Sequence, residues 1–135
     1  MSKDMLLEAS KLHISDVRQG MIWFADKLLH DSINHDHTKI SMIDDFYDSF
    51  SRGLTGDEFK TEKWYQAHLN ERHHLKDKCP EDVNLIDVIE QIVDIVVAGM
   101  ARTGKVFDDD LNETVLMKAY HNTVKLFKEQ VEVVE

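Results

Sequence analysis

The segment VNLIDVIEQIVDIVVAGMA, residues Val83–Ala101, carries the strongest signal for the fold class. Its aliphatic residues point in nearly every direction around a helix axis, which is typical of a helix buried on almost all sides. A strand would distribute the polar residues of this segment over both faces of a sheet. On a helix they are spaced i, i+3, i+4 and i+7 and fall on one face: Asp87, Glu90, Gln91 and Asp94. The segment therefore predicts a buried helix with an acidic ridge, formed by Asp87, Glu90 and Asp94.

Amphipathic periodicity indicates further helices on both sides of this segment. From Asp4 to about His30, apolar residues recur at alternating steps of three and four residues. Glycine and proline are scarce, with 5 and 1 residues among 135, which argues against a turn-rich β-sandwich or barrel. The sequence therefore predicts an all-α fold, a single compact domain of about five helices over residues 1–135. The other expected helices run from about Asp36 to Phe50, from Thr55 or Asp57 through Trp64 and Leu69, and from about Asp108 onward.

The chain is strongly acidic, with 26 acidic against 16 basic residues and a formal net charge of −10. Such a charge repels a phosphate backbone, so we expect no binding to duplex nucleic acid. The most apolar stretch, Ile92–Met100, is interrupted by Asp94 and is far shorter than the roughly 20 residues of a membrane span. Cys79 is the only cysteine, which is typical of a reducing compartment. We therefore expect a cytoplasmic protein with no membrane partner, in the host cytoplasm if a phage encodes it.

Histidines are concentrated in the first 74 residues, which hold seven of the eight. Five of these seven belong to two short motifs, HDHTK at His35–Lys39 and WYQAHLNERHH at Trp64–His74. Within the second motif Trp64, His68 and Arg72 are spaced i, i+4 and i+8, so one helix face can present all three. Imidazole and carboxylate groups together are the ligands that divalent cations such as Mn²⁺, Fe²⁺ or Zn²⁺ recruit.

The acidic ridge needs a positive partner, because an unpaired buried carboxylate costs several kcal/mol or stays protonated. A metal ion held jointly by the ridge and the histidines would meet this need. His13 lies at the edge of the apolar stripe of its helix, so its imidazole can reach a neighbouring helix. We therefore predict that imidazoles from the front half of the chain converge with ridge carboxylates around a shared cation.

The order of these residues resembles the order of the ligands in HD-domain metal-dependent phosphohydrolases. A closer resemblance is to a small family of phage and bacterial proteins of uncharacterised function. Its members share an HD-x-Ser/Thr-Lys element, a Trp-x-x-x-His followed by a His-His pair, and a Glu-x-x-x-Asp helix. This chain has HDHTK, WYQAH with the later HH, and EQIVD in the same order, over most of residues 13 to 94.

The resemblance implies an HD-like fold that holds one or two divalent cations (Mn, Fe, Co, Zn or Mg) and activates water against a phosphate ester. The implied substrate is a nucleotide or another small phosphorylated molecule. The implied primary ligands are His13, His35, Asp36 and Asp94, and the implied second-metal or phosphate contacts are His68, His73 and His74. By the resemblance, Lys39 would stabilise charge on the phosphoryl oxygens, and from the chemistry of the step alone Arg72 or Arg102 could also do so. The EQIVD match assigns the last ligand to Asp94, whereas spacing alone leaves Asp87 and Glu90 as alternatives.

Two other functions are compatible with the sequence. All-α nucleoside triphosphate pyrophosphatases of the MazG kind also set Glu and Asp a turn apart to bind Mg²⁺, but they need few histidines, and here histidines outnumber the candidate carboxylates. A non-catalytic, phage-type helical binding protein would instead coordinate a structural metal with four protein ligands, which leaves no position for water. The last helix has an apolar stripe that could serve a homodimer, although packing on its own core is the default: Tyr120, Val124, Phe127 and Val131.

Overall fold

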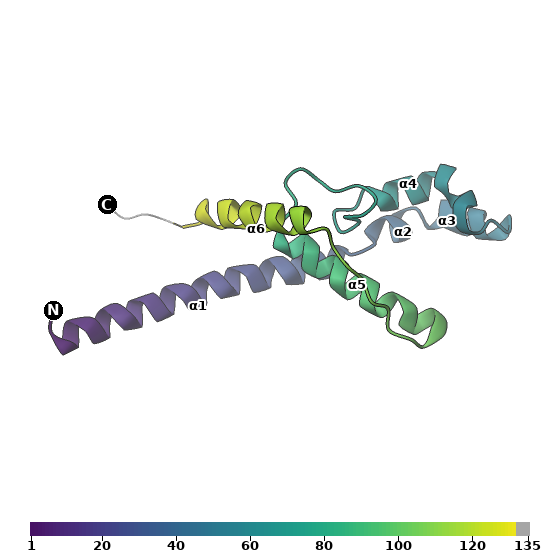
Figure 1. Ribbon diagram of the computed structural model, residues 1–135. Coiled ribbons are helices and arrows are strands. Elements are labelled where there is room, and N and C mark those ends of the chain that lie inside the picture. The colour runs from purple at the N-terminus through teal and green to yellow at the C-terminus, as the bar shows by residue number, and fades with distance from the viewer. Residues whose placement is uncertain (132–135) are drawn as a thin grey trace. The chain divides into compact units, whose positions relative to one another are not determined.

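The computed structural model describes residues 1–131, and of residues 101 and 102 it describes the backbone alone. The described residues form α-helices and one 3-10 helix, with no strand among them, so the prediction of an all-α fold is confirmed (Figure 1). None of the described helices is both long enough and apolar enough to cross a bilayer. In chain order the elements are α1 (Lys3–Asn34), α2 (His37–Ser41), α3 (Ile43–Ser51), η1 (Gly56–Thr61), α4 (Lys63–Leu69), α5 (Leu85–Thr103) and α6 (Glu113–Lys128).

Several helices differ in extent from the sequence prediction. The helix expected from Asp36 to Phe50 is divided into α2 and α3, because Met42 leaves helical geometry at φ −112° and ψ 34°. The next helix is likewise divided, since Glu62 is extended between η1 and α4. The last helix begins at Glu113 and not near Asp108. Asn112 caps this start, because its side chain accepts a hydrogen bond from Thr114 N.

By internal contacts the chain divides into two compact units, Met1–Asn34 and His35–Glu135. The first unit consists of α1 and the two residues before it, and none of its helical residues is buried. The helix expected from Asp4 is confirmed as α1, and Ile14, Val17 and Met21 of its expected apolar stripe are each more than half exposed.

The second unit has its hydrophobic core where α6 packs against the beginning of α5. Leu75, Val83, Val88 and Ala119 form this core. Polar contacts support it, since Thr123 Oγ1 accepts a hydrogen bond from Leu85 N at 2.8 Å. The connection between the two helices crosses from one end of α5 to the start of α6 (Figure 1).

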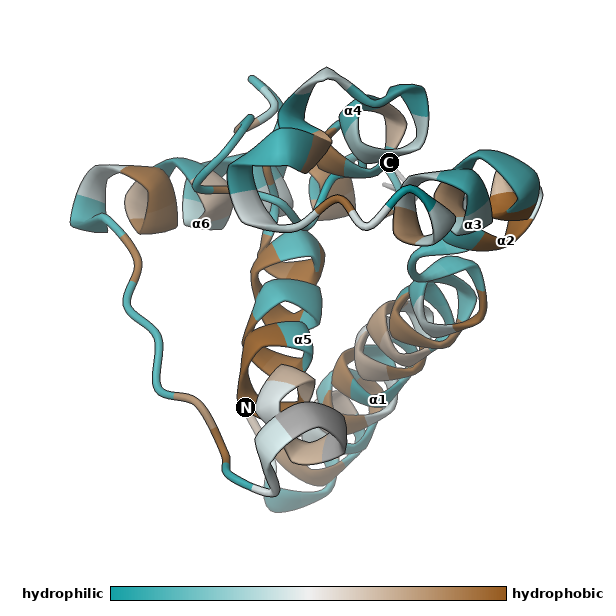
Figure 2. Cartoon of the chain, turned by 90° about the vertical axis from the view of Figure 1, so that its right-hand side faces the viewer, coloured by the Kyte–Doolittle hydropathy of each residue, from teal (hydrophilic) through white to brown (hydrophobic). Residues whose placement is uncertain are grey.

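Burial of α5 ends about halfway along the helix. Figure 2 shows hydrophobic residues, in brown, along the length of α5. Ile86 and Val88 are buried, whereas in the second half Ile95 and Val96 are only half-buried. Four other apolar residues of that half are more than half exposed: Ile92, Val93, Val97 and Met100. Within the second unit, α6 covers only the first half, because it packs around Leu85 and Val88. The expectation of a helix buried on almost all sides therefore holds only for the first half.

An aromatic cluster joins α3, η1 and α4. The ring of Trp64 lies 4.4 Å from that of Phe46 and 5.4 Å from that of Phe59, centroid to centroid. Its indole Nε1 donates a 2.8 Å hydrogen bond to Ser49 Oγ, and both residues are buried. This packing holds α4 against α3 and so fixes the position of His68, one turn after Trp64 on the same helix.

Candidate metal centre

Four imidazoles and four carboxylates gather in the second unit, and we call them the His–carboxylate cluster. They come from three places in the chain: the residues before α2, the end of α4 with the turn that follows, and the middle of α5. Each imidazole lies within 4 Å of a carboxylate oxygen or in ring contact with another imidazole, and each carboxylate lies within 4 Å of an imidazole nitrogen. The members are His35, Asp36, His68, Glu71, His73, His74, Glu90 and Asp94.

Asp36 is at the centre of the cluster and has an unusual backbone conformation. It has φ 53° and ψ 25°, in the left-handed region, and is the one non-glycine residue with positive φ among residues 1–131. Its Oδ1 atom lies 3.3 Å from His73 Nε2, 3.4 Å from His68 Nδ1 and 3.5 Å from His35 Nε2. Its other oxygen, Oδ2, accepts a 2.9 Å hydrogen bond from Lys39 Nζ.

Two carboxylates of the acidic ridge enter the cluster from α5. Glu90 Oε1 lies 2.9 Å from His35 Nδ1 and 3.1 Å from His73 Nδ1. One helical turn later, Asp94 Oδ1 lies 3.2 Å from His35 Nε2, and its Oδ2 lies 3.8 Å from His73 Nε2. The two imidazole rings pack against each other at 4.4 Å between centroids.

Asp87, the third ridge residue, has a structural role. Its carboxylate is 1% exposed and accepts two hydrogen bonds from Arg72, Nε to Oδ1 at 3.0 Å and Nη2 to Oδ2 at 2.9 Å. It also completes a capping box with Asn84 at the start of α5. Of the three alternatives that spacing left open, the structure brings Glu90 and Asp94 to the cluster and uses Asp87 to begin the helix.

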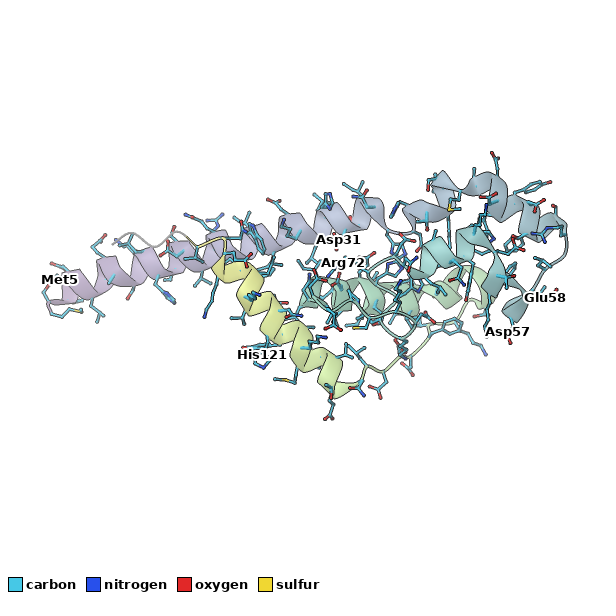
Figure 3. All side chains as sticks on the ribbon, turned by 90° about the horizontal axis from the view of Figure 1, so that it is seen from above. Met5, Asp31, Asp57, Glu58, Arg72 and His121 are labelled. Atoms are coloured by element: carbon cyan, nitrogen blue, oxygen red, sulfur yellow. The ribbon has the colours of Figure 1, made fainter. Side chains whose placement is uncertain are left out.

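Arg72 is engaged by this carboxylate and also donates to Asp82 Oδ1 at 2.9 Å (labelled in Figure 3). The predicted helix face through Trp64, His68 and Arg72 is wrong at its third member, since α4 ends at Leu69. The turn that follows carries the guanidinium toward the start of α5. The pKa of Arg72 is raised above its usual value, first by the hydrogen bonds to Asp87, against a lowering by burial.

Glu71 is a member of the cluster that the sequence analysis missed. Its Oε2 accepts a 2.7 Å hydrogen bond from Thr38 Oγ1 and lies 3.0 Å from His68 Nδ1. Its Oε1 lies 3.0 Å from the Nδ1 of His37, a residue that the sequence analysis did not assign to the site. The available signal was the spacing, because Glu71 follows His68 by three residues, close to one helical turn.

Three buried polar atoms of the cluster lack a hydrogen-bond partner: Asp36 Oδ1, His73 Nε2 and His74 Nε2. A buried polar atom without a partner is costly and rare in folded proteins. The same three residues can each offer one ligand atom within 4.8 Å of the others. Two overlapping groups meet the same criterion, His35 with His73 and Asp94, and Asp36 with His68 and Glu71. Nitrogen and carboxylate oxygen ligands at this separation fit a divalent cation.

The electrostatics of the cluster also favour a cation. Burial lowers the pKa of His73, but Asp36, Glu90 and Asp94 outweigh it and raise that pKa to about 10. Burial would raise the pKa of Asp36, yet the neighbouring His73 and Lys39 hold it well below its usual value. Burial lowers the pKa of His68 and His74. The surrounding carboxylates thus stabilise positive charge at His73, whether a proton or a metal ion supplies it.

Two predicted residues, His13 and Arg102, are not assigned to the cluster. His13 is on α1 in the first unit, so its part in a metal site stays a prediction. His121 is exposed on α6 (Figure 3), and the side chain of Arg102 is outside the described part of the chain. Comparison of the sequence with known protein families and curated proteins, and of the fold with solved structures, gave no match.

Proposed function

We propose that this protein is a metal-dependent hydrolase with an HD-like fold that acts on a phosphate ester, such as a nucleotide or another small phosphorylated molecule. The observation that carries the proposal is the set of three buried atoms without hydrogen-bond partners, Asp36 Oδ1, His73 Nε2 and His74 Nε2. A single cation can satisfy all three at once. The resemblance of HDHTK, WYQAH with HH, and EQIVD to the HD-domain pattern supports the choice of phosphate esters.

The ligands of the proposed centre are drawn from the three groups around Asp36 and His73. His35 and Asp94 extend the centre on one side, and His68 and Glu71 extend it on the other. The chemistry that a divalent cation supplies when bound is activation of water and polarisation of a phosphoryl oxygen. Seven residues in overlapping groups are more than the four that close a structural zinc site, which favours a centre with room for one or two cations.

Lys39 is the residue best suited to meet the substrate. Its side chain is 28% exposed and its ammonium donates to Asp36 Oδ2, so Lys39 lies at the edge of the cluster. An ammonium at this edge can neutralise charge on phosphoryl oxygens. It also holds the Asp36 carboxylate in place, with Oδ1 directed at the imidazoles. We assign Arg72 a supporting role, because Asp82 and Asp87 already bind its guanidinium.

A structural cation in a non-catalytic helical binding protein is the second candidate. Deep burial of part of the cluster favours it, since the side chain of His73 is 2% exposed. A MazG-like pyrophosphatase ranks lower, because imidazoles make up half of the cluster.

The test combines metal analysis with an activity panel. The purified protein is assayed for bound metal, then for hydrolysis of nucleoside mono-, di- and triphosphates and p-nitrophenyl phosphate with Mn²⁺, Co²⁺ or Mg²⁺. Asp36→Asn should lose metal and activity together, by about 100-fold or more in activity. Asp44→Asn, an exposed acid on α3, is the matched control and should retain both. Metal retention without hydrolysis in the wild type would favour the structural cation, and absence of metal binding would contradict both candidates.

A further inference from the structure

Glu90 lies behind two of the imidazoles, on the opposite side from Asp36 and Asp94. From this arrangement, and resting on the proposed metal centre, we infer that Glu90 is a positioning residue and not a metal ligand. One of its two oxygens, Oε1, accepts hydrogen bonds from the Nδ1 atoms of both His35 and His73. The Nε2 atoms of both rings are then directed toward the cation. One carboxylate would thus set the orientation of two ligands.

The distances divide each ring into two sides. On the Nδ1 side, Glu90 Oε1 is 2.9 Å from His35 and 3.1 Å from His73. On the Nε2 side, His35 faces Asp94 Oδ1 at 3.2 Å, and His73 faces Asp36 Oδ1 at 3.3 Å. Both rings therefore have Nδ1 on one shared oxygen and Nε2 on the carboxylates of the proposed centre.

The chemistry of the groups determines which nitrogen carries the proton. An ionised carboxylate only accepts hydrogen bonds, so an Nδ1 atom at 2.9 to 3.1 Å from Glu90 must donate. In the metal-bound state each imidazole is neutral and has one N–H, and using it at Nδ1 leaves the lone pair of Nε2 for the cation. Carboxylates behind ligating imidazoles are known to orient them in this way.

A direct ligand role for Glu90 does not agree with the geometry. In the part of the chain that the structure describes, none of the three groups with ligand atoms within 4.8 Å of one another includes Glu90. Asp94, one turn further along α5, belongs to the group with His35 and His73. The two ridge carboxylates therefore have different roles although they share a helix face.

The experiment compares Glu90→Met, which removes the acceptor, with Glu90→Gln, which lacks the charge but keeps an acceptor oxygen. Cation affinity is measured with Zn²⁺ and Co²⁺, and imidazole protons are observed by nitrogen-15 NMR in metal-free and zinc-loaded protein. In the wild type we expect an Nδ1–H on His35 and His73 in both forms, with zinc on Nε2. Glu90→Met should weaken cation binding about 10- to 100-fold, and Glu90→Gln should restore part of that loss. Glu58→Gln, an exposed residue of η1, is the control.

The outcomes separate this inference from the proposed function. At saturation, the Co²⁺ absorption spectrum of Glu90→Met should keep its wild-type shape, and a changed shape would make Glu90 a ligand and overturn the inference. Unchanged affinity and unchanged Nδ1–H signals in Glu90→Met would also overturn it. If the wild type binds no cation, the proposed function fails, and the metal-free NMR spectra still decide whether Glu90 holds both rings. If Glu90→Met does not fold, the cation affinity and the Nδ1–H signals of Glu90→Gln are compared with those of the wild type instead.

Discussion

Asp36 Oδ1 and His73 Nε2 are buried and lie 3.3 Å apart, within ion-pair distance, and neither atom forms a hydrogen bond of regular geometry. The two residues are 37 positions apart in the sequence (73 − 36) and come from different segments, one before α2 and one after α4. A cation between them would connect these segments with α5 through Asp94. Cation binding should therefore be linked to folding.

This linkage predicts that a bound cation stabilises the protein against unfolding. At a free metal concentration of 100 times Kd, the stabilisation should be about 2.7 kcal/mol for one site. Thermal unfolding followed by circular dichroism, with Zn²⁺ or Mn²⁺ and then with a chelator, measures the change in Tm. Asp36→Asn should remove the metal-dependent shift and Asp44→Asn should keep it. An equal shift in both variants would place the cation away from Asp36.

A second prediction concerns Arg72 and Asp87. Arg72→Met leaves the carboxylate of Asp87, 1% exposed, without two of its hydrogen bonds, so it should cost about 1–3 kcal/mol of unfolding free energy in urea. Adding Asp87→Asn to Arg72→Met should cost less than the sum of the single changes, because no buried charge is then unpaired.

Arg52→Met is the matched control for Arg72→Met. Arg52 pairs with Asp48 and Glu62 at the surface, and its loss should cost much less stability than the loss of Arg72. Equal costs for the two arginines would argue against a buried clamp. A large loss of hydrolysis in folded Arg72→Met, with cation affinity unchanged, would return Arg72 to the substrate-binding role that the sequence predicts.

The close approach of Gly99 to the segment after α5 leads to a third prediction. A Cβ atom at this position would lie 2.4 Å from the backbone oxygen of Lys105 and 2.9 Å from the ring of Phe107. Gly99→Ala gains about 1 kcal/mol of helix propensity but forces this segment to move, so the net effect should be destabilising by about 1–3 kcal/mol. Urea unfolding and the amide shifts of residues 105–107 measure it, and a stabilised variant would contradict the contact.

A fourth prediction concerns how the stability contributed by the Lys76–Asp109 ion pair depends on pH. The carboxylate of Asp109 also accepts a 3.0 Å hydrogen bond from Gln91 Nε2. The hydrogen bond from Lys76 holds the pKa of Asp109 below its usual value. The folded state thus binds the proton more weakly than the unfolded chain, so the stabilisation is present above a pH of about 4 and is lost as the pH falls through the folded pKa.

Asp109→Asn should therefore lower stability by about 0.2–1 kcal/mol near pH 7, and the difference from the wild type should disappear in acid. Asp108→Asn, at the preceding residue, is the control. Urea unfolding at a series of pH values measures both variants. A constant difference between wild type and Asp109→Asn across the acid range would rule out the titration of this carboxylate as the cause.

Much of the candidate centre could be predicted from local patterns. The periodicity of residues 83–101 assigns Glu90 and Asp94 to one helix face, and both reach the cluster. HDHTK and the His-His pair supply Asp36, His73 and His74, whose atoms lack hydrogen-bond partners. These features depend on helix geometry over a few turns, which a single sequence encodes well.

What the sequence could not predict depends on where helices stop. The end of α4 at Leu69 directs Arg72 toward Asp87 and brings Glu71 beside His68 and Thr38. No periodic pattern identifies that end, since it depends on contacts between residues far apart in the chain. The same applies to the exposed second half of α5, because composition alone does not say which part of an apolar helix a neighbour covers.

The left-handed backbone of Asp36 restricts which amino acids can replace it. Aspartate and asparagine visit this conformation more readily than alanine or β-branched residues, because their short side chains bond locally. An alanine here would combine a backbone penalty with the loss of the carboxylate, whereas asparagine separates the two effects. Two independent constraints therefore act on residue 36: it must adopt a left-handed backbone conformation, and it must supply a carboxylate to the cluster. Few amino acids other than aspartate satisfy both.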